Sequence, residues 1–434
     1  MNRLILFPLN TKINSQGHLV IGGCDATELA ADFGTPLYVF DEATLRTKCR
    51  EFKGEFGKRY PDVRVLYACK AFINRAFLRI LKEEGMGLDV VSGGEIGISN
   101  SVSFPMDTVY FHGNSKTAAE LTLALDVQIG RVVVDNFYEL KLLNGLAMTA
   151  DARQDILLRL TPGIDPHTHK YITTGIIDSK FGFNISQAGE AVRQALALPN
   201  LNLVGLHFHL GSLIFETEPY EKSIDVVLNF ASEMKRKYNF ELQELNVGGG
   251  YAVQYTLDQP AGPVSTYAED ITKAVRDKCR EYGLALPRLV IEPGRAIVGQ
   301  AGVALYTVGS IKDIPGIRKY VSVDGGMADN IRPAIYGSKY EALLANRAGE
   351  QNTEKVTIAG KYCESGDILI NDIELPEINS GDIIAIPDSG AYCIPMSSNY
   401  NGAFKPAIVL VNDGKAQLIR RRETALDLIR CDEM

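Results

Sequence analysis

Residues 63–71 read Val-Arg-Val-Leu-Tyr-Ala-Cys-Lys-Ala, a mostly apolar run with a lysine, Lys70, near its end. β-Branched and aromatic residues favour an extended chain, so this run predicts a buried strand. A lysine among apolar neighbours is costly to keep charged, because desolvation favours the neutral amine. A neutral amine fixed at a strand end can form a Schiff base with a carbonyl group. The alternative for Lys70 is an ordinary strand-end lysine whose long side chain carries its ammonium to water.

The same pattern of a short apolar strand followed by an amphipathic helix recurs along the chain. The sequence predicts strands at Val63–Cys69, Leu88–Val91, Thr108–His112, Arg131–Asp135, Ile156–Leu160, Leu203–His209, Glu244–Val247 and Arg288–Glu292. Helical stretches are predicted at Asn74–Glu84, Ala118–Leu125, Ser186–Ala197, Pro219–Tyr238 and Tyr267–Tyr282. Eight alternating units predict an α/β fold of the (βα)8 barrel type. A doubly wound parallel sheet is the alternative architecture.

The pattern changes after Pro293-Gly294, where β-branched strands alternate with turn sequences such as Ser365-Gly366-Asp367 and Asn412-Asp413-Gly414. This predicts a mostly antiparallel β domain over residues 296–434, with helix only around Ser338–Ala345. The barrel is then expected to occupy residues 36–295. Residues 1–35 are too few to fold alone, and we expect them to complete the β domain.

Composition and charge exclude several classes of protein. The 434 residues contain 45 Lys and Arg against 53 Asp and Glu, a net charge of -8, which argues against a nucleic-acid or anionic-membrane surface. No segment approaches the roughly 20 apolar residues of a membrane span, and the apolar stretch before Pro8 is too short for a signal peptide. The seven cysteines are scattered without a CxxC pair, which favours a reduced, cytoplasmic protein over a disulfide framework or a zinc site.

Residues suited to catalysis follow several of the predicted strands. In a barrel, functional groups come from the C-terminal strand ends. Gly248-Gly249-Gly250 lets the backbone approach a ligand closely and offers N–H groups to a phosphate, although most glycine clusters are simply turns. In Glu292-Pro293-Gly294-Arg295, the acid could hold a ring nitrogen protonated and the arginine could bind a phosphate or carboxylate. An ion pair at the barrel end is the alternative interpretation of this motif.

Histidine, cysteine and tyrosine positions complete the candidate site. His207 and His209 share one strand face, where they could form half of a metal site; without a carboxylate cluster we expect a packed or cofactor-stacking imidazole and no metal. Ser212 is a candidate phosphate donor. Cys363, beside Glu364 on a turn, is either a buried apolar side chain or a proton donor. The lysine, the glycines, the acid and Tyr392 jointly suit pyridoxal 5'-phosphate.

Taken together, these segments resemble the fold-type III pyridoxal-phosphate decarboxylases over nearly the whole chain. The supporting segments are Tyr67–Ala71, Asp89–Glu95, His112–Lys116, Ser179–Phe183, His207–Ser212, Gly248–Gly250, Glu292–Arg295, Asp324–Met327, Cys363–Asp367 and Gly390–Tyr392. Each is short, but their order and spacing are specific. The resemblance implies an alanine-racemase-like barrel. It is strongest to the branch of the family that acts on meso-2,6-diaminopimelate.

The resemblance also implies a role for each matched residue. Lys70 would bind the cofactor covalently, His209 would stack on its ring and Glu292 would pair with the ring nitrogen. The remaining cofactor-binding residues would be Asp89, Ser212, Gly248, Gly249, Gly250, Pro293, Gly294, Arg295 and Tyr392. The substrate would be bound by Arg295, Arg332, Tyr336, Glu364 and Tyr392. Cys363 would be the proton donor, and in an obligatory homodimer Cys363 and Glu364 would come from the partner subunit.

The activity implied is decarboxylation of meso-2,6-diaminopimelate to L-lysine and carbon dioxide, the last step of lysine biosynthesis. Two arginines suit a substrate with a remote carboxylate, because guanidinium binds carboxylate bidentately, and Glu364 suits its ammonium. The alternatives are a decarboxylase of D-ornithine, D-lysine or carboxynorspermidine, an amino-acid racemase, and a non-catalytic homologue that only binds the cofactor.

Overall fold

The computed structural model describes residues 3–165 and 179–433, and the contacts within the chain divide it into two compact units. The first, here called the barrel unit, comprises Cys49–Ala252 and Gly262–Gly294. The second, the β unit, comprises Met1–Lys48, Val253–Ala261 and Arg295–Met434. Within the described ranges, no helix is both long enough and apolar enough to cross a membrane.

Eight parallel strands form the predicted barrel. The pairing of β8 with β9 closes the ring, since these two would be the edge strands if the eight strands formed an open sheet. The strands are β5 (Val63–Ala68), β6 (Gly87–Val90), β7 (Val109–Phe111), β8 (Arg131–Val134), β9 (Gln154–Thr161), β11 (Leu201–His207), β12 (Glu244–Asn246) and β13 (Arg288–Ile291). The short strand β10 (Phe183–Asn184) pairs with β9 outside this ring. All eight predicted strands are confirmed, and the closed ring excludes the doubly wound alternative.

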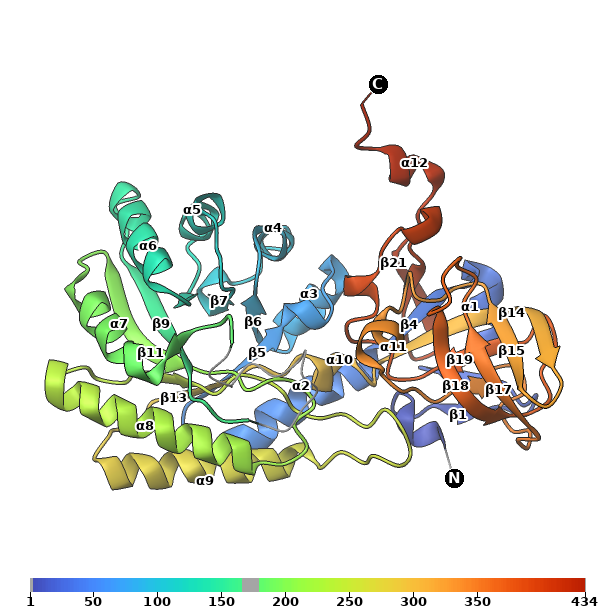
Figure 1. Ribbon diagram of the computed structural model, residues 1–434, viewed down its shortest axis with the longest axis horizontal. Coiled ribbons are helices and arrows are strands. Elements are labelled where there is room, and N and C mark those ends of the chain that lie inside the picture. Colours follow the sequence, from blue (N-terminus) through green and yellow to red (C-terminus); the bar gives the residue numbers. More distant parts are fainter. Residues whose placement is uncertain (1–2, 166–178, 434) are drawn as a thin grey trace. The chain divides into compact units, whose positions relative to one another are not determined.

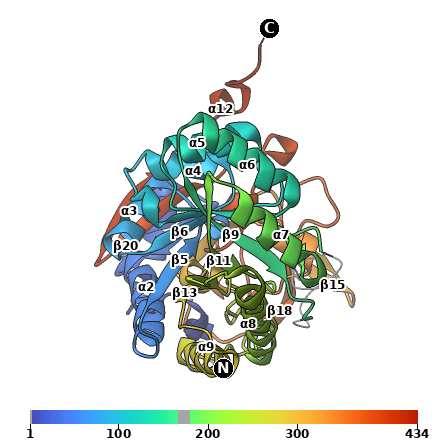
Figure 2. The same cartoon turned by 90° about the vertical axis from the view of Figure 1, so that its left-hand side faces the viewer.

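Helices surround the barrel strands, as Figure 2 shows when the barrel is viewed end on. They are labelled in Figure 1 and comprise α3 (Arg75–Glu83), α4 (Gly93–Asn100), α5 (Ala118–Asp126), α6 (Phe137–Thr149), α7 (Ile185–Ala197), α8 (Glu218–Tyr238) and α9 (Val264–Tyr282). Polar side chains start the first four: Asn74, Ser92, Thr117 and Asn136 each accept a hydrogen bond from a backbone N–H in the first turn. Such caps satisfy N–H groups that the helix leaves unpaired, and they fix where each strand-to-helix loop ends.

The centre of the barrel is packed with side chains. One cluster joins Leu66, Tyr110, Val133, Leu157, Val204 and Val290, which come from different strands and are almost fully buried. The hydroxyl of Tyr110 donates to Glu244 Oε2 at 2.8 Å, so its one polar atom is satisfied. The packed interior gives the strand ends a rigid base.

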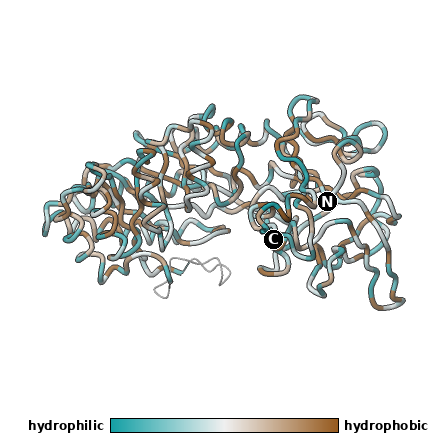
Figure 3. Tube along the Cα trace, turned by 90° about the horizontal axis from the view of Figure 1, so that it is seen from above, coloured by the Kyte–Doolittle hydropathy of each residue, from teal (hydrophilic) through white to brown (hydrophobic). Residues whose placement is uncertain are grey.

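The β unit is built on a sheet in the order β18-β17-β15-β14-β4-β20-β21. Its strands are β4 (Leu37–Asp41), β14 (Gly302–Ile314), β15 (Arg318–Val323), β16 (Leu343–Leu344), β17 (Glu354–Ala359), β18 (Ile368–Leu375), β19 (Ile383–Ile386), β20 (Ala407–Asn412) and β21 (Lys415–Arg420). Most neighbours are antiparallel, while β15–β17 and β4–β20 are parallel. A small sheet of β1 (Lys12–Ile13), β2 (Leu19–Ile21) and β3 (Cys24–Asp25) precedes α1 (Ala26–Phe33). In Figure 3, brown apolar stretches alternate with teal polar ones along the trace.

Two boundaries differ from those predicted from the sequence. The sequence predicts that the barrel begins at residue 36, but β4 pairs with β14 and β20 of the β unit, and α2 (Glu42–Gly57) leads from one unit to the other. Residues 253–261 also belong to the β unit, although they interrupt the barrel's strand–helix alternation. A single strand has no preference in its sequence for which sheet it joins.

The helix predicted around Ser338–Ala345 is wrong. The helix of this region is α11 (Arg332–Tyr336), which has Pro333 in its first turn and ends at Gly337 with a φ of 60°. Proline suits a helix start and a left-handed glycine ends one. Leu343 and Leu344 instead form β16 against β19. Two further short helices are α10 (Arg295–Val298) and α12 (Ala425–Ile429).

We predict that Leu157→Ala destabilises the barrel unit by about 2–5 kcal/mol, because it leaves a cavity among fully buried side chains. The measurement is the midpoint of urea unfolding followed by circular dichroism. Leu196→Ala is the matched control, since Leu196 on α7 is 45% exposed and its truncation leaves no internal cavity. Equal shifts in the two variants would contradict the assignment of Leu157 to the packed centre.

Candidate active site

Lys70 lies directly after β5, in a single 3-10 turn formed by Cys69–Ala71. Its Nζ is 3.9 Å from Asp89 Oδ2 at the end of β6, and its side chain is 40% exposed. The apolar strand therefore leads to a lysine that is accessible and faces a carboxylate. This setting differs from the purely apolar one expected from the sequence, because Asp89 comes from a neighbouring strand.

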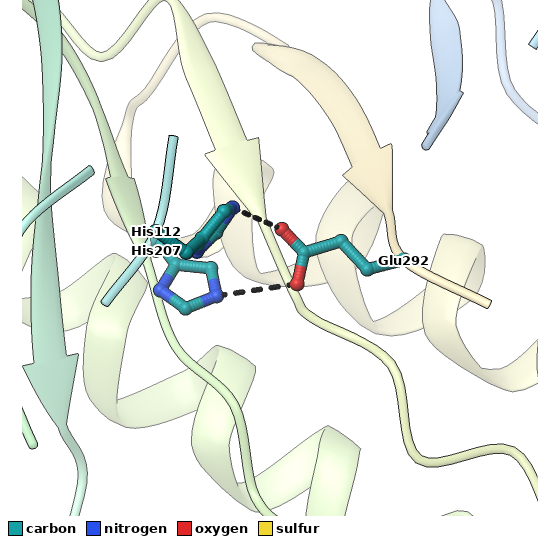
Figure 4. A group of neighbouring side chains, drawn as sticks. All are labelled: His112, His207 and Glu292. Carbon is teal, nitrogen blue, oxygen red and sulfur yellow. Dashed lines mark ion pairs between the residues drawn. The ribbon is translucent and has the colours of Figure 1, made fainter. Parts of the chain in front are cut away.

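Glu292 follows β13 and is a buried acid at this end of the barrel, with 4% of its surface exposed. Its Oε1 lies 2.9 Å from His112 Nε2 and accepts a hydrogen bond of 2.6 Å from Asn246 Nδ2. Its Oε2 lies 3.5 Å from His207 Nε2. Figure 4 shows both imidazoles directed at the two carboxylate oxygens. A buried carboxylate needs such partners, since an isolated charge is costly inside a protein.

The charge states of this group follow from its burial and its contacts. Burial alone would raise the pKa of Glu292, but His112 and His207 together hold it well below its usual range, so Glu292 is ionised. Burial lowers the pKa of His207 to about 3, so this imidazole is neutral at physiological pH. For Asp89, burial raises the pKa, and the nearby His112 only partly offsets it. The site thus holds one firmly ionised acid at its centre.

His207, Glu292 and His112 also have the composition of a metal site, and their nearest ligand atoms lie within 4.8 Å of one another. The sequence predicts no carboxylate beside His207; the structure corrects this, because Glu292 reaches it from a strand far along the chain. Both Glu292 oxygens already have protein partners, which accounts for the cluster without an ion.

The glycines after β12 form a backbone surface that tolerates no side chain. A Cβ on Gly249 would lie 2.2 Å from the backbone oxygen of Glu292, and one on Gly248 would lie 2.6 Å from that of Phe208. Gly248 and Gly250 have φ values of 74° and 115°, which glycine adopts at little cost. Gly248 N–H donates to Asn246 Oδ1 at 2.9 Å, so Asn246 joins the glycine loop to Glu292. The loop is therefore held against the buried acid.

His209 contacts the same loop, since Gly249 N–H donates to its Nδ1 at 3.2 Å. A nitrogen that accepts a hydrogen bond carries no proton, so the ring is neutral. Burial, with the nearby charge of Lys70 as the next cause, holds the pKa of His209 well below its usual value. Ser212 lies in the segment that follows, where Ile214 N–H donates to Gly250 O at 2.9 Å.

The motif Glu292-Pro293-Gly294 runs beside the strand that carries the lysine. Ala68 N–H donates to Pro293 O at 3.2 Å, and a Cβ on Gly294 would lie 2.9 Å from Ala68 Cβ. The acid, the glycine loop and the lysine turn are thus neighbours in the barrel unit. A neutral imidazole, an ionised buried acid, an accessible lysine and a side-chain-free loop fit a phosphorylated pyridine aldehyde such as pyridoxal phosphate.

The other predicted site residues lie in the β unit. Arg332, at the start of α11, is only 2% exposed, and Arg295, at the start of α10, is 8% exposed. The Arg295 guanidinium carbon lies 4.6 Å from the ring centroid of Tyr392. Tyr336 ends α11 and is half-buried. Two arginines taken out of water in one unit form a site prepared for an anion.

Cys363 and Glu364 lie on an exposed turn between β17 and β18. The turn is fixed from inside by Asp367, whose carboxylate accepts hydrogen bonds from Tyr362 N–H at 2.8 Å and Met327 N–H at 2.6 Å. Cys363 N–H donates to Asn401 Oδ1 at 2.9 Å. Of the two roles left open for Cys363, the buried apolar side chain is excluded, because this cysteine is exposed. None of the seven cysteines, all in described residues, forms a disulfide.

Several residues of these sites have no role in the sequence-based prediction. His112 and Asn246 contact Glu292, and both lie at the ends of barrel strands. A polar residue at the end of an apolar run is a sequence pattern that could have identified them as site residues. Tyr255 and Tyr340 hold the arginines of the β unit. No local pattern marks these tyrosines: Tyr255 is 40 residues from Arg295, and Tyr340, although only eight residues from Arg332, follows no motif that predicts the contact.

Comparisons with known proteins identify relatives along the whole chain. Residues 42–299 match the family model described as pyridoxal-dependent decarboxylase, pyridoxal binding domain. The chain is 47% identical over 421 residues to diaminopimelate decarboxylase of Bacillus subtilis (strain 168), covering 96% of each protein. Diaminopimelate decarboxylase from M. jannaschii in complex with L-lysine has a TM-score of 0.92 at 35% identity, covering 98% of both chains. The Helicobacter pylori enzyme complexed with L-lysine has a TM-score of 0.86 at 31% identity, over 93% of this chain and 98% of that one.

We predict that Glu95, on α4 after β6, makes the stability of the barrel unit depend on pH. Burial raises its pKa to about 7, with a smaller contribution from Asp89 and an opposing hydrogen bond from Val91 N–H, whereas the ordinary value is 4.5. Between these two pH values the folded state binds a proton that the unfolded state has lost. The free energy of unfolding therefore falls as pH rises through that window, by about 3 kcal/mol.

The test is the melting temperature between pH 4.5 and 8. Glu95→Gln should flatten the fall, while Glu221→Gln, at an exposed position on α8, should leave it unchanged. Parallel profiles for the wild type and Glu95→Gln would refute the assignment.

Proposed function

The chain belongs to the pyridoxal-dependent decarboxylase family, and we propose that it converts meso-2,6-diaminopimelate to L-lysine and carbon dioxide, the last step of lysine biosynthesis. Its relatives named diaminopimelate decarboxylase share up to 47% identity with it over almost their full length. The observation that carries the choice of substrate is Arg332, which is buried and forms no ion pair with an acid of the described residues. Its charge suits a carboxylate of the ligand. A substrate with two amino-acid ends keeps one carboxylate after the other has left as carbon dioxide.

In the barrel unit, each residue of the cofactor site has a separate task. Lys70 would supply the amine that holds the aldehyde of pyridoxal 5'-phosphate. Glu292, ionised by its contacts with His112 and His207, would keep a proton on the ring nitrogen. The neutral His209 would stack on the ring, and Asp89 faces the lysine amine. When bound, the cofactor accepts the electron pair that the departing carboxylate leaves behind.

The phosphate is assigned to groups that donate hydrogen bonds. These are the backbone N–H groups of Gly248–Gly250 and of Glu292–Arg295, together with the hydroxyls of Ser212 and Tyr392. Pro293 has no N–H to donate, so its part is to fix the chain beside Gly294. Backbone N–H groups on a loop without side chains bind a phosphate at short range. The strain-free positive φ of Gly248 and Gly250 supports this assignment.

Residues of the β unit are assigned to the substrate. Arg295 and Arg332 bind the carboxylate at the end that does not react, with Tyr336 and Tyr392, and Glu364 binds the ammonium of that end. Cys363 or Lys70 then delivers a proton to the carbon that lost carbon dioxide. A decarboxylase that forms a simple diamine has no remote carboxylate to bind, so the buried charge of Arg332 favours diaminopimelate over D-ornithine and D-lysine.

We propose that the active form is a homodimer in which the partner subunit supplies Cys363 and Glu364 to each site. The support is their exposure on a turn that Asp367 fixes from below, so both side chains face outward from their own protomer. A proton donor exposed to water would be a poor catalytic group, whereas a second chain would cover it. The reduced thiols support a cytoplasmic location.

The first test of the proposal is release of carbon dioxide. The wild type is expected to act on meso-diaminopimelate and not on the L,L-isomer or on D-lysine. Lys70→Ala should lose activity by at least about a thousandfold, because it removes the covalent attachment of the cofactor. Lys82→Ala, whose amine donates to Ser103 O at the surface, is the control and should remain active. Turnover of D-lysine in preference to diaminopimelate would overturn the choice of substrate.

The shared site is tested by mixing two inactive variants, Lys70→Ala and Cys363→Ala. If each site combines Lys70 of one chain with Cys363 of the other, exchanged heterodimers regain one intact site. The mixture should then recover about a quarter of wild-type activity. Recovery of none after verified subunit exchange would show that both residues come from the same chain.

A further inference from the structure

Tyr255 contacts both arginines of the β unit. Arg295 Nη1 donates to its hydroxyl at 2.7 Å, and the Arg332 guanidinium carbon lies 4.7 Å from its ring centroid. The segment that carries it, residues 253–261, is inserted in sequence between the glycine loop and α9 but belongs to the β unit. One side chain, 8% exposed, therefore sets the position of two buried cations.

Tyr340 completes this arrangement. Arg332 Nη1 donates to its hydroxyl, and the Tyr340 ring meets the Tyr255 ring edge to face, with centroids 5.4 Å apart at 86°. The Tyr340 hydroxyl also lies 3.6 Å from Cys393 Sγ, and Cys393 is fully buried. Arg332 Nε is buried without a hydrogen-bond partner in the structure. Arg332 is thus oriented by aromatic rings and a phenolic hydroxyl, and its Nε–H remains as a hydrogen-bond donor.

Tyrosines differ from acids in what they do to an arginine. A carboxylate beside Arg332 would orient it but would also neutralise its charge. An aromatic face and a hydroxyl attract the guanidinium without a full opposing charge. Asp388 is an acid that interacts electrostatically with Arg332, and burial raises the pKa of Asp388 well above its usual value, which favours the uncharged form. The positive charge of Arg332 stays available for a ligand.

We propose that Tyr255 is a positioning residue that holds Arg295 and Arg332 as one carboxylate-binding pair, and that together with Tyr340 it sets the preference for ligands with a remote carboxylate. This inference rests on the proposed function and adds the residues that give it selectivity. Tyr255 acts through the arginines and need not touch the reacting carbon.

The test uses two ligands that differ by one carboxylate, L-lysine and cadaverine, titrated into the cofactor-loaded enzyme by calorimetry. Tyr255→Phe removes the hydrogen bond to Arg295 and keeps the ring against Arg332; it should weaken L-lysine binding about tenfold. Tyr255→Leu removes the ring as well and should weaken it about a hundredfold. Cadaverine binding should be unchanged in both. Tyr340→Phe should behave like Tyr255→Phe.

The matched control is Tyr60→Phe, which deletes another buried hydroxyl, one that donates to Pro287 O at 2.7 Å in the barrel unit. It should leave both affinities unchanged. In steady-state assays, Tyr255→Phe should raise KM for meso-diaminopimelate about tenfold with kcat unchanged, as expected when uniform binding is lost. The visible absorption of the bound cofactor should match the wild type, which separates positioning from misfolding.

The outcomes separate the two proposals. If the wild type releases carbon dioxide from diaminopimelate but Tyr255→Phe binds L-lysine as tightly as the wild type, the positioning role is refuted and the function stands. If the wild type lacks that activity yet prefers L-lysine to cadaverine through Tyr255, the function fails and the positioning role stands. A wild type that binds the two ligands equally, or neither, overturns the inference.

Discussion

An ionised carboxylate buried at the end of β13 is the constraint on which the barrel site depends. Glu292 stays charged at 4% exposure because His112, His207 and Asn246 meet its two oxygens. Asn246 also accepts from Gly248 N–H, so the same contact fixes the glycine loop. Moving any of these strands would leave a buried charge without a partner, which costs several kcal/mol. The packed barrel centre is therefore a precondition for the site.

In the β unit the buried charged groups of the predicted site are arginines instead of a carboxylate. Its buried arginines must keep their charge available for a ligand and still be held in place when none is bound. Aromatic rings and phenolic hydroxyls hold Arg332, and Tyr255 joins it to Arg295. The barrel thus stabilises its central charge through protein contacts, while Arg332 of the β unit forms no ion pair with an acid of the described residues. The proposed cofactor and the proposed substrate carboxylate correspond to these two arrangements.

Strand positions were predictable because each depends on local pattern: apolar runs marked the eight barrel strands, and amphipathic stretches marked helices such as Asn74–Glu84 and Ala118–Leu125. Residue types that few chemistries use together, Lys70, Gly248–Gly250 and Glu292, identified the candidate cofactor site. Prediction failed where partners were distant. The residues near His207 in the sequence do not indicate that Glu292 contacts it. Likewise, the sequence of Leu37–Asp41 does not indicate that β4 pairs with β14 and β20.

The sequence by itself predicted the barrel, with a doubly wound sheet as the alternative, and drew attention to the lysine, the acid and the glycine loop, because these follow from periodicity and from residue types at strand ends. The family was indicated by the resemblance of its motifs. Only the tertiary structure decided which charges are compensated. Asp89 faces Lys70, His112 and Asn246 hold Glu292, and Tyr255 joins two arginines. The physical reason is that electrostatic interactions depend on distance and burial in space, and chain order specifies neither.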